Sequence, residues 1–185
     1  MINYDELYKI VKEKLSEKRF RHSQNVVKRA LEYAKIYGMD ENIVKLCAIS
    51  HDIAKEFTDS ENREYIEKYN IKLDDIEKEN KSLIHAKIGA EIVKNEYGFS
   101  EDMSNAIKYH TTGRANMSTL EKIICLADAT EEGREELNLE YVEIIKRNLD
   151  EGMVEICKWC LEYILSTKKV IHPDTINCYN YYLLK

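Results

Sequence analysis

Residues that break helices are scarce in this sequence, and their scarcity limits the folds open to it. The 185 residues include 6 glycines and a single proline, Pro173. A β-rich chain of this length needs more of both residues for its turns, and the apolar residues follow a helical period almost throughout. The sequence therefore predicts an all-α fold. The length predicts a single domain over residues 1–185, with roughly 70% of the unfolded surface buried.

Amphipathic stripes and capping residues divide the chain into helices. Gly38 and Gly98 each follow such a stripe, as glycines at helix C-termini do, and Ser118 and Glu121 form a capping box. The stretch over 40–55, capped by Asp40, has no polar face, so we expect it at the centre of the fold. Helices are expected over residues 3–17, 22–37, 40–55, 83–97, 100–110, 118–128, 138–149 and 152–167, with a short surface helix within 57–80 and a terminal helix after Pro173.

The charge balance and the cysteine content exclude several classes of protein. With 28 basic and 34 acidic residues the net charge is −6, which argues against a general nucleic-acid or membrane-surface binder. A small anionic ligand would need a basic pocket inside an acidic protein. The start of the sequence lacks the basic and apolar regions typical of a signal peptide, no apolar run reaches membrane-spanning length, and the number of cysteines is odd. We expect a cytoplasmic protein, and a homodimer is compatible with the sequence.

Several polar residues lie on or beside helix faces that should be buried. A buried aspartate without a partner costs several kcal/mol or changes its protonation state. A metal centre explains the whole set, because imidazole and carboxylate are metal ligands and the cation neutralises buried charge. Each histidine taken alone is more simply a hydrogen-bonded core residue, but four of the five take part. The residues are His22, His51, Asp52, His85, His110 and Asp128.

Lys55 lies on the same helical face as His51 and Asp52. A lysine beside a metal pair repels the cations unless an anion such as phosphate lies between them. Taken alone, Lys55 is explained equally well as a lysine at a helix end. Its aliphatic chain would pack along the helix while its amine reaches water.

Six segments carry a resemblance to a known family. They are Arg19-Phe20-Arg21-His22-Ser23, His51-Asp52-Ile53-Ala54-Lys55, His85-Ala86-Lys87-Ile88-Gly89-Ala90, His110-Thr111-Thr112-Gly113, Leu126-Ala127-Asp128 followed by Arg134, and Ile171-His172-Pro173-Asp174-Thr175 leading to Asn180-Tyr181. In this order they resemble the HD superfamily of metal-dependent phosphohydrolases, and more narrowly its YqeK-type members, which cleave diadenosine tetraphosphate symmetrically. The resemblance runs from about residue 5 to the end of the chain. It departs from the family pattern over 130–133, where a proline is expected before the arginine.

The resemblance implies a compact HD-type helical bundle with a buried dinuclear metal site. Asp52 would bridge the two metals, and iron is the usual metal of the family, although this ligand set also permits manganese, cobalt or zinc. One metal would be held by His22, His51, Asp52 and Asp128, and the other by His85, His110 and Asp52.

The resemblance also implies the reaction. A hydroxide bridging the metals would attack a β-phosphate of diadenosine tetraphosphate and expel ADP, so that two ADP form. Positive groups would meet the developing negative charge. The catalytic residues would be Asp52, Lys55 and Arg134, and the substrate contacts Arg19, Arg21, Lys55, Thr111 and Arg134.

Three other functions remain open at this stage. A nucleotidase or phosphatase acting on nucleoside mono- or diphosphates can use the same scaffold, but often with one metal, whereas His85 together with His110 favours two. A di-iron oxygenase needs no cation clamp, whereas Lys55 and Arg134 favour phosphate chemistry. A nucleotide sensor without turnover would be free to lose ligands, and all six are present here.

Three further features are interpreted as structural. Cys157 and Cys160 form a C-x-x-C spacing, but they lie on an apolar stripe, so we expect them in the core. The acidic run over 74–79 is expected to be a solvated face. His172 lies outside any inward stripe and is expected to have no catalytic role.

Overall fold

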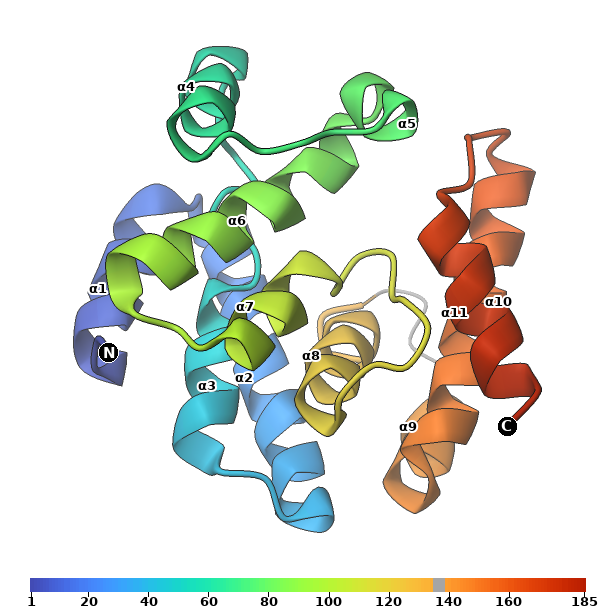
Figure 1. Ribbon diagram of the computed structural model, residues 1–185. Coiled ribbons are helices and arrows are strands. Elements are labelled where there is room, and N and C mark those ends of the chain that lie inside the picture. The colour runs from blue at the N-terminus through green and yellow to red at the C-terminus, as the bar shows by residue number, and fades with distance from the viewer. Residues whose placement is uncertain (135–138) are drawn as a thin grey trace.

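The computed structural model describes residues 1–134 and 139–185, and this part of the chain contains eleven helices and no strand. The all-α prediction is confirmed. The helices are α1 (Tyr4–Lys14), α2 (Glu17–Tyr37), α3 (Glu41–Ser50), α4 (Asp59–Tyr69), α5 (Asp75–Glu79), α6 (Lys81–Tyr97), α7 (Glu101–Lys108), α8 (Thr119–Ala129), α9 (Leu139–Arg147), α10 (Leu149–Ser166) and α11 (Pro173–Leu183), as Figure 1 shows.

Most helix ends follow the capping residues in the sequence. Gly38 and Gly98 adopt the left-handed conformation after α2 and α6, with φ of 65° and 74°, which a glycine does at no steric cost. Asp40 accepts backbone N–H bonds at the start of α3. The capping box of Ser118 and Glu121 starts α8. These local predictions are confirmed.

Some boundaries differ from the prediction, and two of the differences matter for the site. Helix α3 ends at Ser50, so the chain around His51 and Asp52 forms tight turns in which Ile53 N–H bonds Ser50 O at 3.0 Å. Helix α7 likewise ends before His110, which lies in the following turn.

At two other places a capping residue explains why the observed helix boundary differs from the predicted one. Helix α2 begins five residues before the predicted start, because the Ser16 hydroxyl caps it. The stretch over 57–80 forms two helices rather than one, because Thr58 and Asp74 each start a helix with a capping box.

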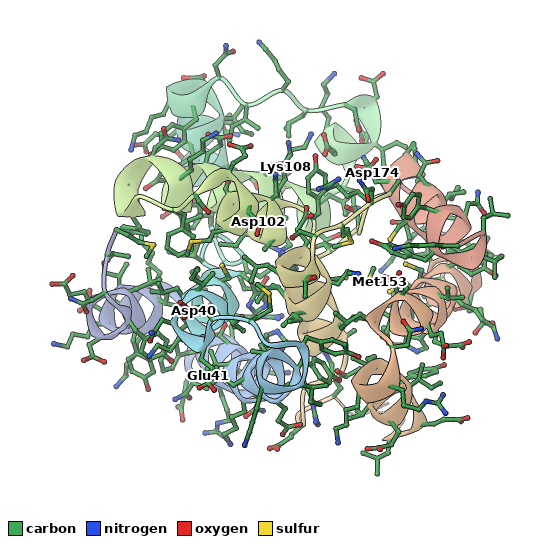
Figure 2. The ribbon with its side chains drawn as sticks, turned by 60° about the horizontal axis from the view of Figure 1, so that its bottom comes forward. Asp40, Glu41, Asp102, Lys108, Met153 and Asp174 are labelled. Carbon is green, nitrogen blue, oxygen red and sulfur yellow. The ribbon has the colours of Figure 1, made fainter. Side chains whose placement is uncertain are left out.

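Helix α3 lies at the centre of the bundle, as its lack of a polar face predicted. It contacts α1, α2, α7 and α8, and Val44, Cys47 and Ile49 on it are fully buried. Helices α4 and α5 lie outside this group and contact α6 (Figure 1). Helices α9 to α11 lie on the other side of α8, with the buried Met153 between α8 and the C-terminal helices (Figure 2).

The cysteines are free thiols, and Cys157 contributes to the core as expected. Its sulfur lies 3.4 Å from that of Cys178 on α11, and Cys160 is partly buried against the same core. Within residues 1–134 and 139–185, every helix lacks either the length or the apolar character needed to cross a lipid bilayer.

Candidate metal centre

Five separate elements bring the six predicted ligand side chains to one place. The site lies where the end of α3 meets α2, α6, α7 and α8, the central helices of Figure 1. Four of the six residues are almost completely buried, and the side chains of His22 and Asp128 retain 12% and 19% exposure. The contributing residues are His22 from α2, His51 and Asp52 from the turns after α3, His85 from α6, His110 from the turn after α7, and Asp128 from α8.

The first half of the cluster forms around His22. Its Nε2 atom lies 3.1 Å from Asp128 Oδ1 and 3.3 Å from His51 Nε2. His51 Nε2 in turn lies 3.3 Å from Asp52 Oδ2. Two imidazoles and two carboxylates therefore converge on one small volume.

The second half contains the remaining two histidines. His85 Nε2 lies 3.2 Å from His110 Nε2 and 3.0 Å from Asp52 Oδ1. Asp52 thus turns one carboxylate oxygen toward each half of the cluster, Oδ2 toward His51 and Oδ1 toward His85.

Hydrogen bonds to the backbone fix the tautomers of two histidines. His51 Nδ1 lies 2.8 Å from Ala48 O, and His110 Nδ1 lies 2.7 Å from Ile107 O. A carbonyl oxygen only accepts, so each Nδ1 carries the proton and each Nε2 presents a lone pair to the cluster. Metal-binding histidines are typically oriented in this way.

Glu131 orients the third histidine, and sequence reasoning missed it. Its carboxylate lies 3.1 Å from His22 Nδ1 and is buried, so the ring donates there and directs Nε2 at Asp128 and His51. The spacing along the chain could have indicated this role, because Glu131 follows Ala127 by four residues and Ile124 by seven and so continues the inward face of α8.

The charges in the cluster are strongly perturbed. Burial alone would raise the pKa of Asp52, but His51, His110 and His85 outweigh it and hold that pKa well below its usual range. Burial also opposes ionisation of Asp128, yet the hydrogen bond to His22 and the charge of Arg134 lower its pKa strongly. Both carboxylates are therefore anionic at neutral pH.

The pKa values of His85 and His22 shift in opposite directions. Burial lowers the pKa of His85 to about 4, so this ring is neutral at pH 7. Burial also disfavours the charged form of His22, but its bonds to Asp128 and Glu131 outweigh burial and raise its pKa.

The cluster fits a divalent cation in each half. The Nε2 atoms of His22 and His51 face one another at 3.3 Å, and those of His85 and His110 at 3.2 Å, an arrangement that is unfavourable without a cation or proton between them. Asp52 Oδ1 accepts no hydrogen bond within the described residues, although it is buried. Ligand atoms of His22, His51 and Asp128, and of His51, Asp52 and His110, lie within 4.8 Å of one another. Imidazole and carboxylate suit iron, manganese, cobalt or zinc.

Comparison with known proteins identifies this site. Residues 19–133 match the HD domain family. The chain belongs to the HD domain family. The resemblance of its motifs to HD-superfamily phosphohydrolases is thereby confirmed, and the chain is a metal-dependent hydrolase of this family.

Relatives within the HD family match over the whole chain. A protein of Halalkalibacterium halodurans named symmetrical bis(5'-nucleosyl)-tetraphosphatase is 37% identical, over 100% of this chain and 99% of its own. A Bacillus subtilis protein of the same name is 31% identical over 97% of each chain. The crystal structure of a predicted HD superfamily hydrolase involved in NAD metabolism, from Clostridium acetobutylicum, matches with a TM-score of 0.93 at 32% identity, covering 100% of this chain and 98% of that one.

Three predicted cationic residues contact the HD centre directly. Lys55 Nζ lies 3.4 Å from His85 Nε2, and burial lowers the pKa of this amine despite Asp52 and Asp128 nearby. Arg19 Nη1 lies 3.0 Å from Asp52 Oδ2.

Arg134 meets the other carboxylate of the centre. It donates to Asp128 through two nitrogens, with Nε 3.0 Å from the backbone oxygen and Nη2 2.5 Å from Oδ1. The departure from the family pattern over 130–133 therefore leaves the arginine at the site.

The other two predicted substrate contacts lie farther out. Arg21 is largely exposed and pairs with Glu17 at 3.1 Å, away from the HD centre. Thr111 is half-buried, and its hydroxyl lies 3.1 Å from His110 Nε2 at the edge of the centre.

A cavity of about 740 Å³ opens from the His22 side of the HD centre. We call it the aromatic groove, because three aromatic side chains line it together with four basic residues and two carboxylates. It is lined by Ser16, Lys18, Arg19, Arg21, His22, Asn25, Glu56, Ala129, Glu131, Gly133, Arg134, Tyr141, Ile156, Trp159 and Tyr163. The groove is thus a basic pocket in a protein of net negative charge. The charge balance predicts that any site for a small anion needs such a pocket.

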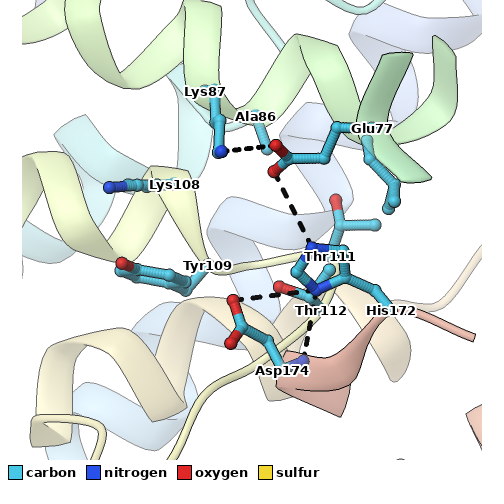
Figure 3. Close-up of a pocket in the computed structure, with 10 residues that line it drawn as sticks. Glu77, Ala86, Lys87, Lys108, Tyr109, Thr111, Thr112, His172 and Asp174 are labelled. Carbon is cyan, nitrogen blue, oxygen red and sulfur yellow. Dashed lines mark hydrogen bonds and ion pairs between the residues drawn. The ribbon is translucent and has the colours of Figure 1, made fainter. Parts of the chain in front are cut away.

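A second cluster of possible metal ligands lies at the junction of α5, α6 and α11. Its polar atoms already bond to one another and to neighbouring residues. Asp74, Glu77 and His172 could together hold an ion, but both His172 nitrogens are in use. Nε2 donates to Asp74 Oδ2 at 2.9 Å. Nδ1 accepts the Asp174 N–H at 3.2 Å, a contact drawn in Figure 3. Lys87 neutralises Glu77 at 2.5 Å. These contacts support the structural interpretation of His172.

The same contacts correct one expectation. The acidic run over 74–79 is not a uniformly solvated face, because Glu77 is only 4% exposed. Its burial is compensated by Lys87, which lies on the neighbouring helix α6. The flanking Asp75, with a side chain 97% exposed, is solvated as predicted.

Proposed function

We propose that this chain hydrolyses diadenosine tetraphosphate symmetrically to two ADP. The observation that carries the proposal is the position of Asp52, whose two carboxylate oxygens face two separate pairs of histidines. This arrangement supports a two-metal site, which suits hydrolysis of a phosphoric anhydride. The full-length relatives named symmetrical bis(5'-nucleosyl)-tetraphosphatase support the choice of substrate.

The proposed ligand sets follow from the two halves of the cluster. His22, His51, Asp52 and Asp128 would hold one metal, and His85 and His110 would hold the other, with Asp52 shared. Iron is the metal we propose. When bound, the cations supply a nucleophilic hydroxide from water near neutral pH and attract phosphoryl oxygens.

The chain's own cations would position the tetraphosphate. Lys55, Arg19 and Arg134 each lie beside a carboxylate or histidine of the centre. A polyphosphate entering from the aromatic groove offers these residues stronger charge-assisted partners. In the reaction a water-derived oxygen would bond to Pβ. The bond from Pβ to the oxygen that joins the two β-phosphates would break, and that oxygen would leave with the second ADP. Lys55 and Arg134 would stabilise the charge on the transferring phosphoryl group.

The remaining predicted contacts take lesser roles in this proposal. Arg21 lies on the rim of the groove, where it can attract the substrate. The Thr111 hydroxyl beside His110 can donate to a phosphoryl oxygen on the far side of the centre.

Product analysis tests the proposal. The protein is purified without oxygen, its metals are measured by elemental analysis, and the products from diadenosine tetraphosphate are separated by chromatography. We expect about two metal ions per chain, mainly iron, and ADP as the sole product. ATP together with AMP would contradict symmetric cleavage. Turnover of mononucleotides alone would favour a nucleotidase instead.

A matched pair of variants tests the ligand assignment. Replacing His85 and His110 with alanine should remove one metal per chain and leave the other. Replacing His172, whose nitrogens are already hydrogen-bonded, should leave the metal content unchanged. Equal metal content in the wild type, the His85 and His110 double variant and the His172 variant would refute the assignment of His85 and His110 to the second metal.

A further inference from the structure

The aromatic groove brings cationic and aromatic side chains together in one cavity. At its inner end lie His22, Glu131 and Arg134, and Arg134 contacts Asp128 of the metal centre. The wall formed by Trp159 and Tyr163 lies on α10, a helix that contributes no proposed metal ligand. A ligand that fills the groove therefore meets both cations and aromatic rings.

The rings of Trp159 and Tyr163 are not explained by packing of the core. Neither residue belongs to the hydrophobic core or to the side chains packed against it, whereas Tyr141 does. Tyr163 is 50% exposed, and neither its hydroxyl nor the Trp159 indole N–H makes a hydrogen bond within the described residues. Their centroids lie 6.5 Å apart with planes 23° from parallel. Two flat faces are thus held close to parallel at the edge of a basic cavity.

The size and charge of the groove limit the kinds of ligand that it can bind. Its volume of about 740 Å³ is within the range of about 300–1,000 Å³ typical of small-molecule sites. Both carboxylates in its lining are already bonded, Glu56 by Ser16 and Glu131 by His22. Lys18 and the three arginines outnumber these two carboxylates in the lining, so an entering anion meets a net positive charge there. A polyphosphate joined to a planar aromatic group matches both kinds of lining side chain.

We propose that the aromatic groove binds one ADP half of the substrate, with its nucleobase stacked on Trp159 and bordered by Tyr163. This inference rests on the proposed function, since it assigns an end of that substrate to a place in the fold. Stacking on an aromatic ring tolerates any base, because every base has a π face. The groove thus provides affinity for nucleosides in general rather than selection of adenine.

Trp159 is the sole tryptophan of the chain, so its fluorescence reports on this subsite without turnover. Titration of the purified full-length protein with ADP should quench the emission. Inorganic tripolyphosphate, which has no base, should leave it nearly unchanged while competing with diadenosine tetraphosphate in the hydrolysis assay. Equal quenching by both ligands, or by neither, would overturn the subsite. Emission that changes with protein concentration instead would assign the rings to an interface between copies.

Kinetics of variants give a second readout. Trp159→Ala should raise KM for diadenosine tetraphosphate about 10-fold with little change in kcat, and Trp159→Phe, which keeps a ring, should retain most of the affinity. Tyr163→Ala should raise KM several-fold, whereas Tyr163→Phe should not, because the hydroxyl has no partner. Tyr65→Ala, on α4 outside the groove, is the control for loss of an aromatic side chain.

The outcomes separate this inference from the proposed function. If the wild-type protein forms no ADP from diadenosine tetraphosphate, the proposed function fails. If it forms ADP while Trp159→Ala and Tyr163→Ala keep wild-type KM values, the subsite alone is wrong.

Discussion

His22 on α2 and Glu131, 109 positions later in the chain, share a contact of 3.1 Å between Nδ1 and a carboxylate oxygen. Because the carboxylate accepts, the imidazole keeps its proton on Nδ1 and turns Nε2 toward Asp128. Burial would raise the pKa of Glu131, but the bonds from His22 and from the Gly133 N–H lower it. Glu131 therefore stays ionised and acts as a positioning residue for a proposed metal ligand.

Glu131→Ala should weaken metal binding by about 10- to 100-fold, the usual effect of removing a partner that orients a ligand. Glu131→Gln should lie in between, since its amide oxygen still accepts from Nδ1 but carries no charge. Competition with a chelator of known affinity measures both values, and circular dichroism checks the fold. Metal affinity that is unchanged in Glu131→Ala would contradict the role.

Lys55→Met should lower kcat for diadenosine tetraphosphate about 100-fold, because a half-buried cation is removed from beside the transferring phosphoryl group. Metal content should stay at the wild-type value. Lys94→Met, which removes an exposed lysine paired with Glu101 on α6 and α7, is the matched control and should be fully active. A rise in KM at constant kcat would instead assign Lys55 to binding alone.

The stability of the metal-free protein should increase with pH between about 4 and 6.5. Burial lowers the pKa of His85 to about 4, whereas the same ring in the unfolded chain titrates near 6.5. Within this window only the unfolded chain takes up the proton, so His85 contributes up to about 3 kcal/mol that is lost as the pH falls.

Urea unfolding of the chelator-treated protein at several pH values tests this dependence. His85→Gln should be less sensitive to pH than the wild type across the same window. The comparison is between these two proteins, because His22, with a raised pKa, contributes stability of opposite sign, which is lost as the pH rises. Identical pH slopes would mean that His85 is not neutral in the folded protein.

Gly113→Ala should destabilise the protein more than Gly38→Ala. Both glycines have a positive φ, 66° and 65°, so each substitution carries a similar backbone cost of about 1–2 kcal/mol. A Cβ at Gly113 would also lie 2.6 Å from the Cys178 sulfur, whereas Gly38 has nothing within 4 Å. The overpacking should add about 1–3 kcal/mol.

Denaturant unfolding of both variants measures that difference. Adding Cys178→Ala to Gly113→Ala should recover part of the lost stability, because the clashing sulfur is then absent. If Gly113→Ala and Gly38→Ala are equally stable, the contact between Gly113 and α11 is looser than the structure describes.

The sequence by itself determined the helical class and most of the helix ends. Apolar periodicity and caps such as Asp40, Ser118 and Gly98 report hydrogen bonds between residues three or four positions apart, so they can be recognised without knowing the rest of the fold. The inward positions of the proposed ligands were predicted from the same stripes, although His51, Asp52 and His110 lie in the turns that directly follow α3 and α7. This is why the proposed ligand residues could be found before any contact was known.

Only the tertiary structure decided which residues complete the site. The bond from His22 to Glu131 and the position of Trp159 beside the basic groove join segments far apart in the chain. Such contacts depend on how helices pack, and periodicity within one helix does not encode the position of another. The sequence could therefore show that polar side chains point inward, while the packing of α2, α3, α6, α7 and α8 decided that they meet around Asp52.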